Sequence, residues 1–413
     1  MQTQLADFIK DTPEGMEADR ILRSCVHCGF CLATCPTYQL LGNELDSPRG
    51  RIYLIKQMLE GGPATEKTVL HLDRCLTCRA CETTCPSGVQ YGKLIDIGRG
   101  IAEQRVGRSW VAQAKRKALR ALLLSPSVFG SLFKLGQTFR TWLPSALKEN
   151  VPAPVAAGLW PTSTHARKML VLAGCVQPAM APQINSAAAR VLDRLGISLV
   201  VAPEAGCCGA LSYHLNAHDE ALDFMRRNID AWIPYLDQGI EAIVMTASGC
   251  GVTVREYGYY LKHDAAYAEK AARVSSMTRD VSEILVAEKE ALQRLLGAVN
   301  PNIKSTKLAV HTPCTLQHGQ QISGVLEAVL TRAGFEVLPA PDRHLCCGAA
   351  GTYSILQPVL SEQLRKNKIT ALETNQPTRI VTANIGCLLQ LQSGTQTPVA
   401  HWIELIDEVL KPA

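Results

Sequence analysis

The 413-residue sequence contains neither a long apolar run nor a recognisable export signal. Its N-terminus, MQTQLADFIKDTPEG, has no basic segment followed by an apolar one, so we expect no secretory signal. The uncharged stretch 121–133 has only 13 residues and includes Pro126, whereas a helix that crosses a bilayer needs about 20 apolar residues. We therefore expect a cytoplasmic chain that does not cross a membrane.

Strong net charge and a dinucleotide fingerprint are also missing. The net charge is only +5, so the composition gives no reason to expect binding to nucleic acid. No G-x-G-x-x-G segment follows an expected strand, which excludes one type of dinucleotide site. Hydrophobic content of 47% and charged content of 19% are those of an ordinary folded protein. The length allows two or three domains.

Cysteine, by contrast, is abundant, with 16 residues. Cytosolic thiols are kept reduced, so clustered cysteines there bind metal or carry out redox chemistry rather than form a disulfide framework. Eight of them form two runs with the spacing C-x2-C-x2-C-x3-C-P, namely CVHCGFCLATCP at 25–36 and CLTCRACETTCP at 75–86. This spacing is typical of proteins that hold two [4Fe–4S] clusters. Structural zinc, the alternative, usually uses two separated cysteine pairs or includes histidine.

In two-cluster proteins the fourth cysteine of each run ligates the cluster of the other run. We therefore predict that the first cluster is bound by Cys25, Cys28, Cys31 and Cys85, and the second by Cys35, Cys75, Cys78 and Cys81. Pro36 and Pro86 are expected to stop a helix and turn the fourth thiolate across. His27, Arg74 and Arg79 lie in or beside the runs. We expect them to be surface or partner-contact residues, with tuning of the cluster potential as the alternative.

The remaining eight cysteines form an internal repeat. Cys175, Cys207 and Cys208 recur 139 residues later as Cys314, Cys346 and Cys347, while Cys250 recurs 137 residues later as Cys387. Short apolar runs such as KMLVLAG and KLAVHTP alternate with helical patterns around them. Strands that alternate with helices favour a parallel sheet, with the cysteines at the carboxyl ends of its strands. Duplication of one α/β lobe explains this pattern.

The expected fold is therefore α+β and multidomain. Residues 1–100 form a mostly helical, ferredoxin-type domain for two clusters, and two repeated α/β lobes occupy 168–300 and 301–413. Between them, 101–167 is predicted to be a basic helical segment followed by a Pro/Ala/Gly-rich linker. From residue 104 to 148 there are nine Lys/Arg and no acidic residue. We expect this segment to dock on an acidic partner subunit, or else to lie against an anionic membrane surface.

The segments GCCGALSYH and LCCGAAGTYS resemble the cysteine-rich CCG domains of heterodisulfide reductases. Together with CVHCGFC, SPRGRIYLIKQ, TASGCG and VTANIGC, they make the chain similar to the iron–sulfur subunits of glycolate oxidases (glycolate dehydrogenases). The resemblance implies an electron-transfer subunit that does not convert substrate alone. FAD-containing partner subunits would oxidise glycolate to glyoxylate, and electrons would pass toward a quinone or respiratory acceptor. It also implies a cytoplasmic protein with peripheral contact at the inner membrane.

Several alternatives stay open at this point. The same architecture occurs in iron–sulfur subunits of anaerobic glycerol-3-phosphate and lactate dehydrogenases. The CCG cysteines could instead act as a thiol or disulfide reductase, or the clusters could be structural parts of a redox sensor. The heterodisulfide reductase repeat ends in a cysteine pair, whereas here one cysteine ends each repeat, so it stays open whether one lobe, both lobes or neither holds a further cluster. His214, His311, His318 and His344 lie near these cysteines, as candidate ligands or as packing residues.

Overall fold

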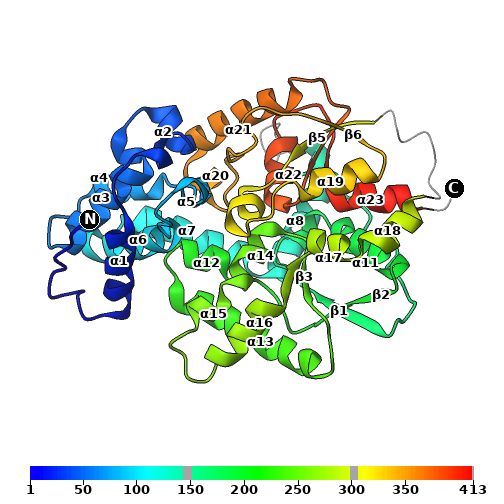
Figure 1. Ribbon diagram of the computed structural model, residues 1–413, viewed down its shortest axis with the longest axis horizontal. Helices are drawn as coiled ribbons and strands as arrows, with labels where there is room; N and C mark the ends of the chain where they lie inside the picture. Colours follow the sequence, from blue (N-terminus) through cyan, green and yellow to red (C-terminus); the bar gives the residue numbers. More distant parts are fainter. Residues whose placement is uncertain (143–150, 298–305, 412–413) are drawn as a thin grey trace.

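A computed structural model describes residues 1–142, 151–297 and 306–411 of the protein (Figure 1). A helical N-terminal region lies at one end of the molecule, and two lobes with small sheets make up the rest. The expected α+β fold, with a mostly helical N-terminal region followed by two lobes with parallel sheets, is confirmed. The predicted boundary between the lobes, at 300/301, and the end of the basic segment, 143–148, lie outside the described residues.

The N-terminal region has no strand in its described part, residues 1–106. It is built from α1 (Pro13–Ser24), η1 (Phe30–Leu32), α2 (Pro36–Leu41), η2 (Glu44–Asp46), α3 (Pro48–Leu59), α4 (Glu66–Asp73), α5 (Ala80–Thr84) and α6 (Tyr91–Val106). The helix expected between the two cysteine runs is α3, and the Ser47 side chain caps its N-terminus by accepting from the Gly50 amide. Leu22, Ile55 and Leu94, from three of these helices, meet in one buried core.

Pro36 differs from its prediction, because it begins a helix rather than ends one. It is the first residue of α2, where the missing amide hydrogen costs nothing since no intrahelical acceptor is available at that position. Pro86 follows the end of α5 and lies in a turn. The two runs thus share cysteine spacing, but the chain leaves them in different conformations.

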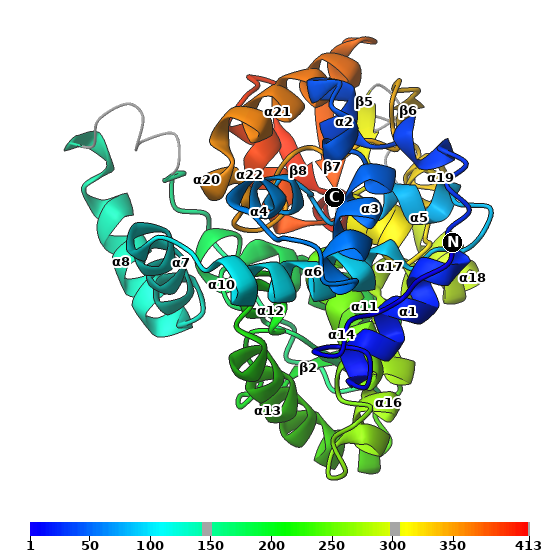
Figure 2. The same cartoon turned by 90° about the vertical axis from the view of Figure 1, so that its left-hand side faces the viewer.

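The basic segment forms two helices, α7 (Trp110–Leu123) and α8 (Pro126–Thr138), followed by the turn η3 (Arg140–Trp142). They project from the body of the molecule as an arm (Figure 2). No single helix in the described residues is long and apolar enough to cross a bilayer. Only α7 and α8 taken together reach that length and composition, and they bend by 89° at the break between them. The predicted linker, described from residue 151, has no regular secondary structure up to residue 166.

Each lobe contains a four-stranded, fully parallel sheet, with the strand orders β2-β1-β3-β4 and β6-β5-β7-β8. The first lobe comprises β1 (Arg167–Val171), α10 (Gln177–Met180), α11 (Gln183–Arg194), β2 (Ile197–Val201), α12 (Ala210–His214), α13 (His218–Asp237), β3 (Ile243–Met245), α14 (Ser248–Arg255), α15 (Tyr257–Tyr260), α16 (Ala268–Met277), β4 (Thr278–Asp280), α17 (Val281–Ala287) and α18 (Lys289–Leu296). The second comprises β5 (Lys307–His311), η5 (Thr315–Gly319), α19 (Val325–Arg332), β6 (Glu336–Leu338), α20 (Tyr353–Leu356), α21 (Pro358–Glu373), β7 (Arg379–Thr382), α22 (Ile385–Gln392), β8 (Val399–His401) and α23 (Trp402–Leu410). Three strands of each sheet match expected strands, whereas the short fourth strands β4 and β8 carried no sequence signal.

The lobes share one hydrophobic core. In this core, the first long helix of each lobe packs against the helix that follows the fourth strand of the other lobe. Helix α11 packs against α23, and α19 packs against α17. Asp280 and His401 occupy matching positions, because each caps the helix that follows the fourth strand of its lobe. The duplicated sequence therefore forms a pair of lobes that pack against each other.

Candidate iron–sulfur sites

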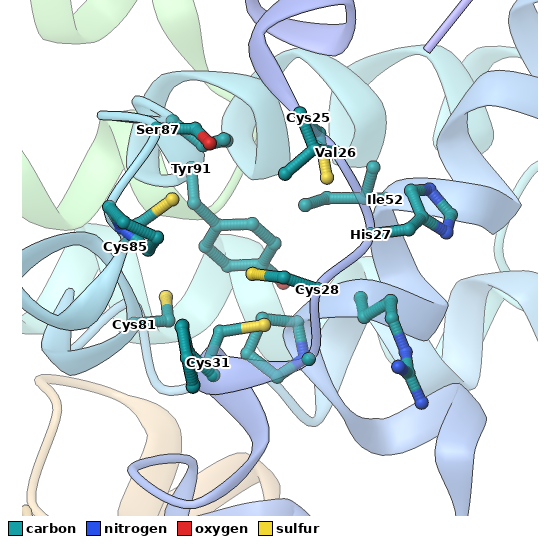
Figure 3. Close-up of a pocket in the computed structure, with 16 residues that line it drawn as sticks. Cys25, Val26, His27, Cys28, Cys31, Ile52, Cys81, Cys85, Ser87 and Tyr91 are labelled. Atoms are coloured by element: carbon teal, nitrogen blue, oxygen red, sulfur yellow. The ribbon is translucent and has the colours of Figure 1, made fainter.

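The first cavity lies between the two cysteine runs (Figure 3). The thiols that line it belong to Cys25, Cys28, Cys31, Cys81 and Cys85. In both runs, the residues two and four positions after the first cysteine have left-handed backbone conformations, at His27 and Gly29 and at Thr77 and Arg79. These left-handed residues bend each loop so that backbone amides point toward sulfur atoms. The Thr77 amide, for example, lies 3.4 Å from the Cys75 Sγ.

The second cavity is lined by thiols from both runs, those of Cys35, Cys75, Cys78 and Cys81. The fourth cysteine of each run therefore lines the cavity that the other run's first three cysteines help to form. Cys81 and Tyr91 line both cavities, and the Tyr91 hydroxyl lies 3.7 Å from the Cys75 Sγ. The two cavities are thus separated by little more than one thiol and one aromatic ring.

The spread of these thiols fits a cluster better than a single ion. Among the described residues, one group of three Cys, His, Asp or Glu side chains has its ligand atoms within 4.8 Å of one another, and it lies outside these cavities. Thiolates around one tetrahedral zinc, with Zn–S of about 2.3 Å, sit only about 4 Å apart. A cubane carries its thiolates on four separate corners, so donors spread around an open cavity suit it.

Burial makes these thiols poor anions on their own. It raises the pKa of Cys31 to about 11 and those of Cys78 and Cys81 well above the ordinary thiol value. A bound metal cation offsets the free-energy cost of a buried thiolate, because coordination to the metal deprotonates the thiol. The donor set and its burial therefore both fit iron–sulfur ligation.

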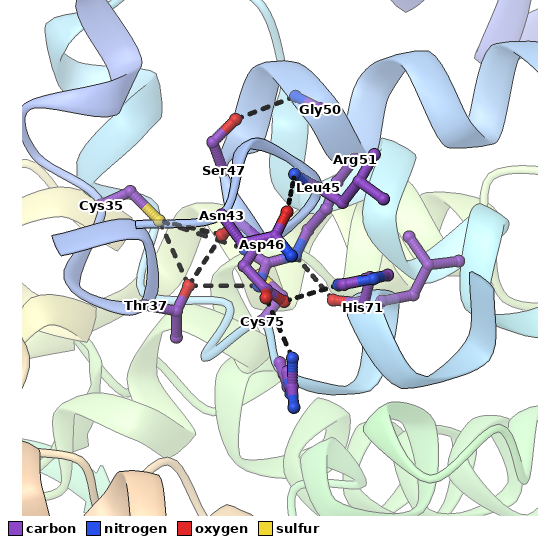
Figure 4. Close-up of polar contacts among 12 residues, drawn as sticks. Cys35, Thr37, Asn43, Leu45, Asp46, Ser47, Gly50, Arg51, His71 and Cys75 are labelled. Carbon is purple, nitrogen blue, oxygen red and sulfur yellow. Dashed lines mark hydrogen bonds and ion pairs between the residues drawn. The ribbon is translucent and has the colours of Figure 1, made fainter. Parts of the chain in front are cut away.

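A buried ionic network without any signal in the sequence borders the second cavity (Figure 4). The Arg51 side chain is 1% exposed, donates to the His71 carbonyl at 2.7 Å, and places Nη1 4.0 Å from the Cys35 Sγ. Asp46, fully buried, lies 3.5 Å from Arg51, 3.0 Å from Arg74 and 3.0 Å from His71. A fixed cation beside a cluster ligand favours the reduced cluster, since it stabilises added negative charge.

Arg79 is not the surface residue that was expected. Its two terminal nitrogens donate to both Glu256 oxygens at 2.6 and 2.7 Å, and the pair is largely buried. The carboxylate holds the Arg79 pKa above its ordinary value, despite burial. Since Glu256 follows α14, this ion pair joins the second cysteine run to the first lobe.

In each lobe the four repeated thiols form a continuous chain. In the first lobe, Cys175 and Cys207, Cys207 and Cys208, and Cys208 and Cys250 are close enough for one thiol of each pair to shift the pKa of the other. The second lobe repeats this order through Cys314, Cys346, Cys347 and Cys387, with 3.8 Å between the first two sulfurs.

The glycine after each cysteine pair is required by its surroundings. Gly209 and Gly348 both have left-handed conformations, with φ of 89° and 86°, and each amide lies 3.4 Å from the sulfur two residues earlier. A Cβ at Gly209 would lie 2.8 Å from the Ala221 carbonyl oxygen, and one at Gly348 2.7 Å from that of Ser361. The predicted tight turn is therefore present in both lobes.

The four candidate histidines have different roles. His214 lies 3.4 Å from Asp96, and His318 contacts Thr83 and the His344 carbonyl, so these two rings hold the lobes to the N-terminal region. His311 alone joins the thiols, because its ring lies within 4.8 Å of the Cys347 and Cys387 sulfurs. Burial keeps its pKa well below the ordinary histidine value.

Contacts connect the thiols of the two cavities and of the two lobes in series. Cys78 of the second cavity lies in one buried apolar cluster with Cys314, Cys346 and Tyr353 of the second lobe. From there, Asn384 donates to the Cys387 sulfur at 3.6 Å and accepts from the Gly249 amide, next to Cys250, at 3.2 Å. The order is thus first cavity, second cavity, second lobe, first lobe.

Comparisons with known proteins agree with this arrangement. The 4Fe–4S dicluster domain model matches residues 21–89, and the cysteine-rich domain model CCG matches 169–255 and 308–392. The "Glycolate oxidase iron-sulfur subunit" of Escherichia coli (strain K12) is 54% identical over the full length of both chains. The chain belongs to the family of glycolate oxidase iron–sulfur subunits.

Within this family, the "Probable glycolate oxidase iron-sulfur subunit" of Bacillus subtilis (strain 168) is 30% identical, over 96% of this chain and 94% of that protein. "Lactate utilization protein A" of Anoxybacillus flavithermus (strain DSM 21510 / WK1) is 27% identical, but matches only 56% of this chain and 96% of its own length. The predicted resemblance is confirmed. As a glycolate oxidase iron–sulfur subunit, the chain is an electron-transfer component of a multisubunit oxidoreductase and holds iron–sulfur clusters.

Proposed function

We propose that this chain carries electrons from FAD-containing subunits of a glycolate dehydrogenase toward a quinone or another respiratory acceptor. Oxidation of glycolate to glyoxylate on the partner releases two electrons and two protons. A quinone takes up two electrons and two protons, so the reaction balances when this chain conducts the electrons one at a time. The observation that carries the proposal is the pair of thiol-lined cavities sharing Cys81 and Tyr91, in a chain whose full length matches a glycolate oxidase subunit.

For the first [4Fe–4S] cluster we propose the ligands Cys25, Cys28, Cys31 and Cys85, and for the second Cys35, Cys75, Cys78 and Cys81. A bound cubane accepts and releases single electrons. The CCG cysteines are proposed to hold one or two further clusters. Their position in series with the second cavity supports this extension. The domain division 1–100, 101–167, 168–300 and 301–413 is proposed alongside these assignments.

Two exposed surfaces are proposed as contacts. Val26, Phe30 and Cys28 are exposed at the rim of the first cavity, and an apolar rim beside a redox site suits a partner that delivers electrons. Trp110, at the start of α7, and Trp142, in η3 after α8, are exposed by 79% and 86% amid basic side chains. We assign this arm first to an acidic partner subunit and second to peripheral contact with the cytoplasmic face of the inner membrane.

The test is anaerobic co-purification of the chain with its flavoprotein partners. Iron and sulfide are counted, and reduction of a quinone analogue by glycolate is measured. About eight irons per chain are expected from the N-terminal clusters and about twelve to sixteen with the lobes filled, at four irons per cubane. Zinc in the N-terminal cavities, or glycolate oxidation by the isolated chain, contradicts the proposal. Activity with lactate or glycerol 3-phosphate in place of glycolate would keep the electron-transfer role and replace the substrate.

A further inference from the structure

His311 is a buried histidine whose ring makes no hydrogen bond to the described residues. It is the last residue of β5 and is 2% exposed. Within the part of the chain that the structure describes, neither ring nitrogen has a hydrogen-bond partner. An imidazole without partners costs free energy in the core, because it has given up its water. A ligand that binds the ring nitrogen would offset this cost.

The ring is directed at the thiols of its own lobe. One of its nitrogens lies within 4.8 Å of the sulfur atoms of Cys347 and Cys387, and all three residues are buried. Lys368 is the charged side chain that influences the ring, and its amine donates to the Asp342 carbonyl at 2.7 Å. No acidic side chain is among the groups that influence the ring. The nitrogen therefore faces two sulfurs rather than a carboxylate.

The first lobe provides an internal comparison. The offset of 139 residues that relates Cys175 to Cys314 places Leu172 at the position of His311. Leu172 is buried among apolar side chains in the core of its lobe. The two lobes thus carry the same chain of four thiols, but only the second adds an imidazole at this matched position.

We propose that His311 is a protein ligand in the second lobe, where its ring nitrogen binds one iron of the proposed cluster beside the Cys347 and Cys387 sulfurs. This rests on the proposed function, in which the lobe binds such a cluster. Neutral imidazole is a suitable ligand for iron. Because imidazole carries no charge, an iron bound by it in place of a thiolate makes a cluster easier to reduce. The lobe adjoining Cys78 would then differ from its twin as an electron acceptor.

The test uses the complete complex, isolated anaerobically and reduced, with 15N-labelled histidine. Electron–nuclear double resonance of wild-type protein is expected to show a 15N coupling typical of directly bound imidazole. His311→Leu, which installs the residue of the first lobe, removes that coupling. His344→Leu, a control in the same lobe whose side chain makes none of these contacts, retains it. If His311→Leu does not fold, the labelled wild-type spectrum decides alone.

The outcomes separate this inference from the proposed function. Twelve or more irons per chain without a histidine 15N coupling overturns the ligand role of His311 and leaves the electron-transfer function intact. About eight irons per chain, with glycolate-dependent reduction of the N-terminal clusters, also overturns it while the function stands. Loss of the N-terminal cluster signals in wild-type protein would instead overturn the function itself.

Discussion

In the N-terminal region the cysteines lie on two loops and on the short helical turns η1 and α5 that these loops contain, whereas in the lobes they follow the carboxyl ends of parallel strands. The loop cysteines line two open cavities, with Cys81 facing both. The lobe cysteines contact one another directly, as Cys314 and Cys346 do at 3.8 Å between sulfurs. One region keeps its donors apart, and the other brings them together.

The difference shows how each region specifies its site. In the loops, cysteine spacing and left-handed residues such as Gly29 and Arg79 set the donor positions locally. In the lobes, the donors come from separate strands and meet only after the sheet has formed. A loop site therefore depends on its own sequence, and a lobe site on the fold around it.

The largest expected effect comes from comparing two single variants, each of which lacks one thiol of one region. Cys81→Ala removes a donor that faces both cavities, so we expect loss of at least four irons per chain and a fall of about 100-fold or more in glycolate-dependent quinone reduction. Cys208→Ala, in the first lobe at the end of the series, should reduce this rate by less than about 10-fold. Iron analysis and steady-state assays of the complex check both. A larger loss from Cys208→Ala would place the first lobe on the main electron route.

The second prediction concerns the ion pair that joins the two regions, and it changes no thiol. Arg79→Ala leaves Glu256 buried without its cation, and breaking a buried ion pair costs about 3 kcal/mol. Glu256→Ala should cost a similar amount, and the double variant little more than either single variant. Anaerobic urea unfolding measures the three free energies. Additive losses would mean that the two side chains do not stabilise the junction through each other.

The third effect concerns acid stability of the lobes. His401 is buried in their shared core, donates from Nε2 to the Thr246 carbonyl and accepts the Ile403 amide at Nδ1. Burial lowers the pKa of His401 to about 4. The unfolded chain, with a histidine pKa of about 6.5, binds the proton first, so stability present above pH 6.5 is lost as the pH falls toward 4. Between pH 7 and pH 5 the loss should be about 2 kcal/mol.

His401→Asn tests this acid sensitivity. Asparagine is a good helix cap but does not titrate, so the variant should unfold with a shallower dependence on pH over the same range. Unfolding free energies from anaerobic urea titrations at pH 7 and pH 5 give the comparison. An unchanged slope would assign the acid sensitivity to other groups.

Much of the fold and of the candidate sites follows from sequence, for identifiable reasons. Each cavity is lined by the four cysteines that the spacing grouped together, with Cys81 lining both; their roles as cluster ligands stay a prediction. The repeat predicted paired lobes, and apolar runs predicted three strands in each sheet. Strands β4 (TRD) and β8 (VAH) were missed because, unlike the equally short β3, they include polar residues and stand in no continuous apolar run.

Contacts between distant segments could not be read from the chain. Arg79 was expected at the surface, because charged residues are mostly exposed, but only the fold brings Glu256 to it, 177 residues later. Arg51 lacked a signal for the same reason. Its guanidinium donates to groups from α4 and from the first residues of α2, 20 and 14 residues away, as well as to the nearer Asp46. His311 was one of four candidates, and only the assembled lobe distinguishes it.

The smallest effect tests whether Arg51 tunes the loop site. Arg51→Met removes the cation 4.0 Å from the Cys35 sulfur but keeps much of the side-chain volume. If the Arg51 cation stabilises the reduced cluster by about 1 kcal/mol, its loss lowers the one-electron reduction potential of that cluster by about 40 mV. EPR-monitored redox titration should show this downward shift for the second cluster alone. Arg49→Met serves as the matched control, because Arg49 lies beside the first cavity and pairs with Glu44 at 2.8 Å. A shift of both clusters by Arg51→Met would mean that the variant disturbs the whole N-terminal fold rather than one site.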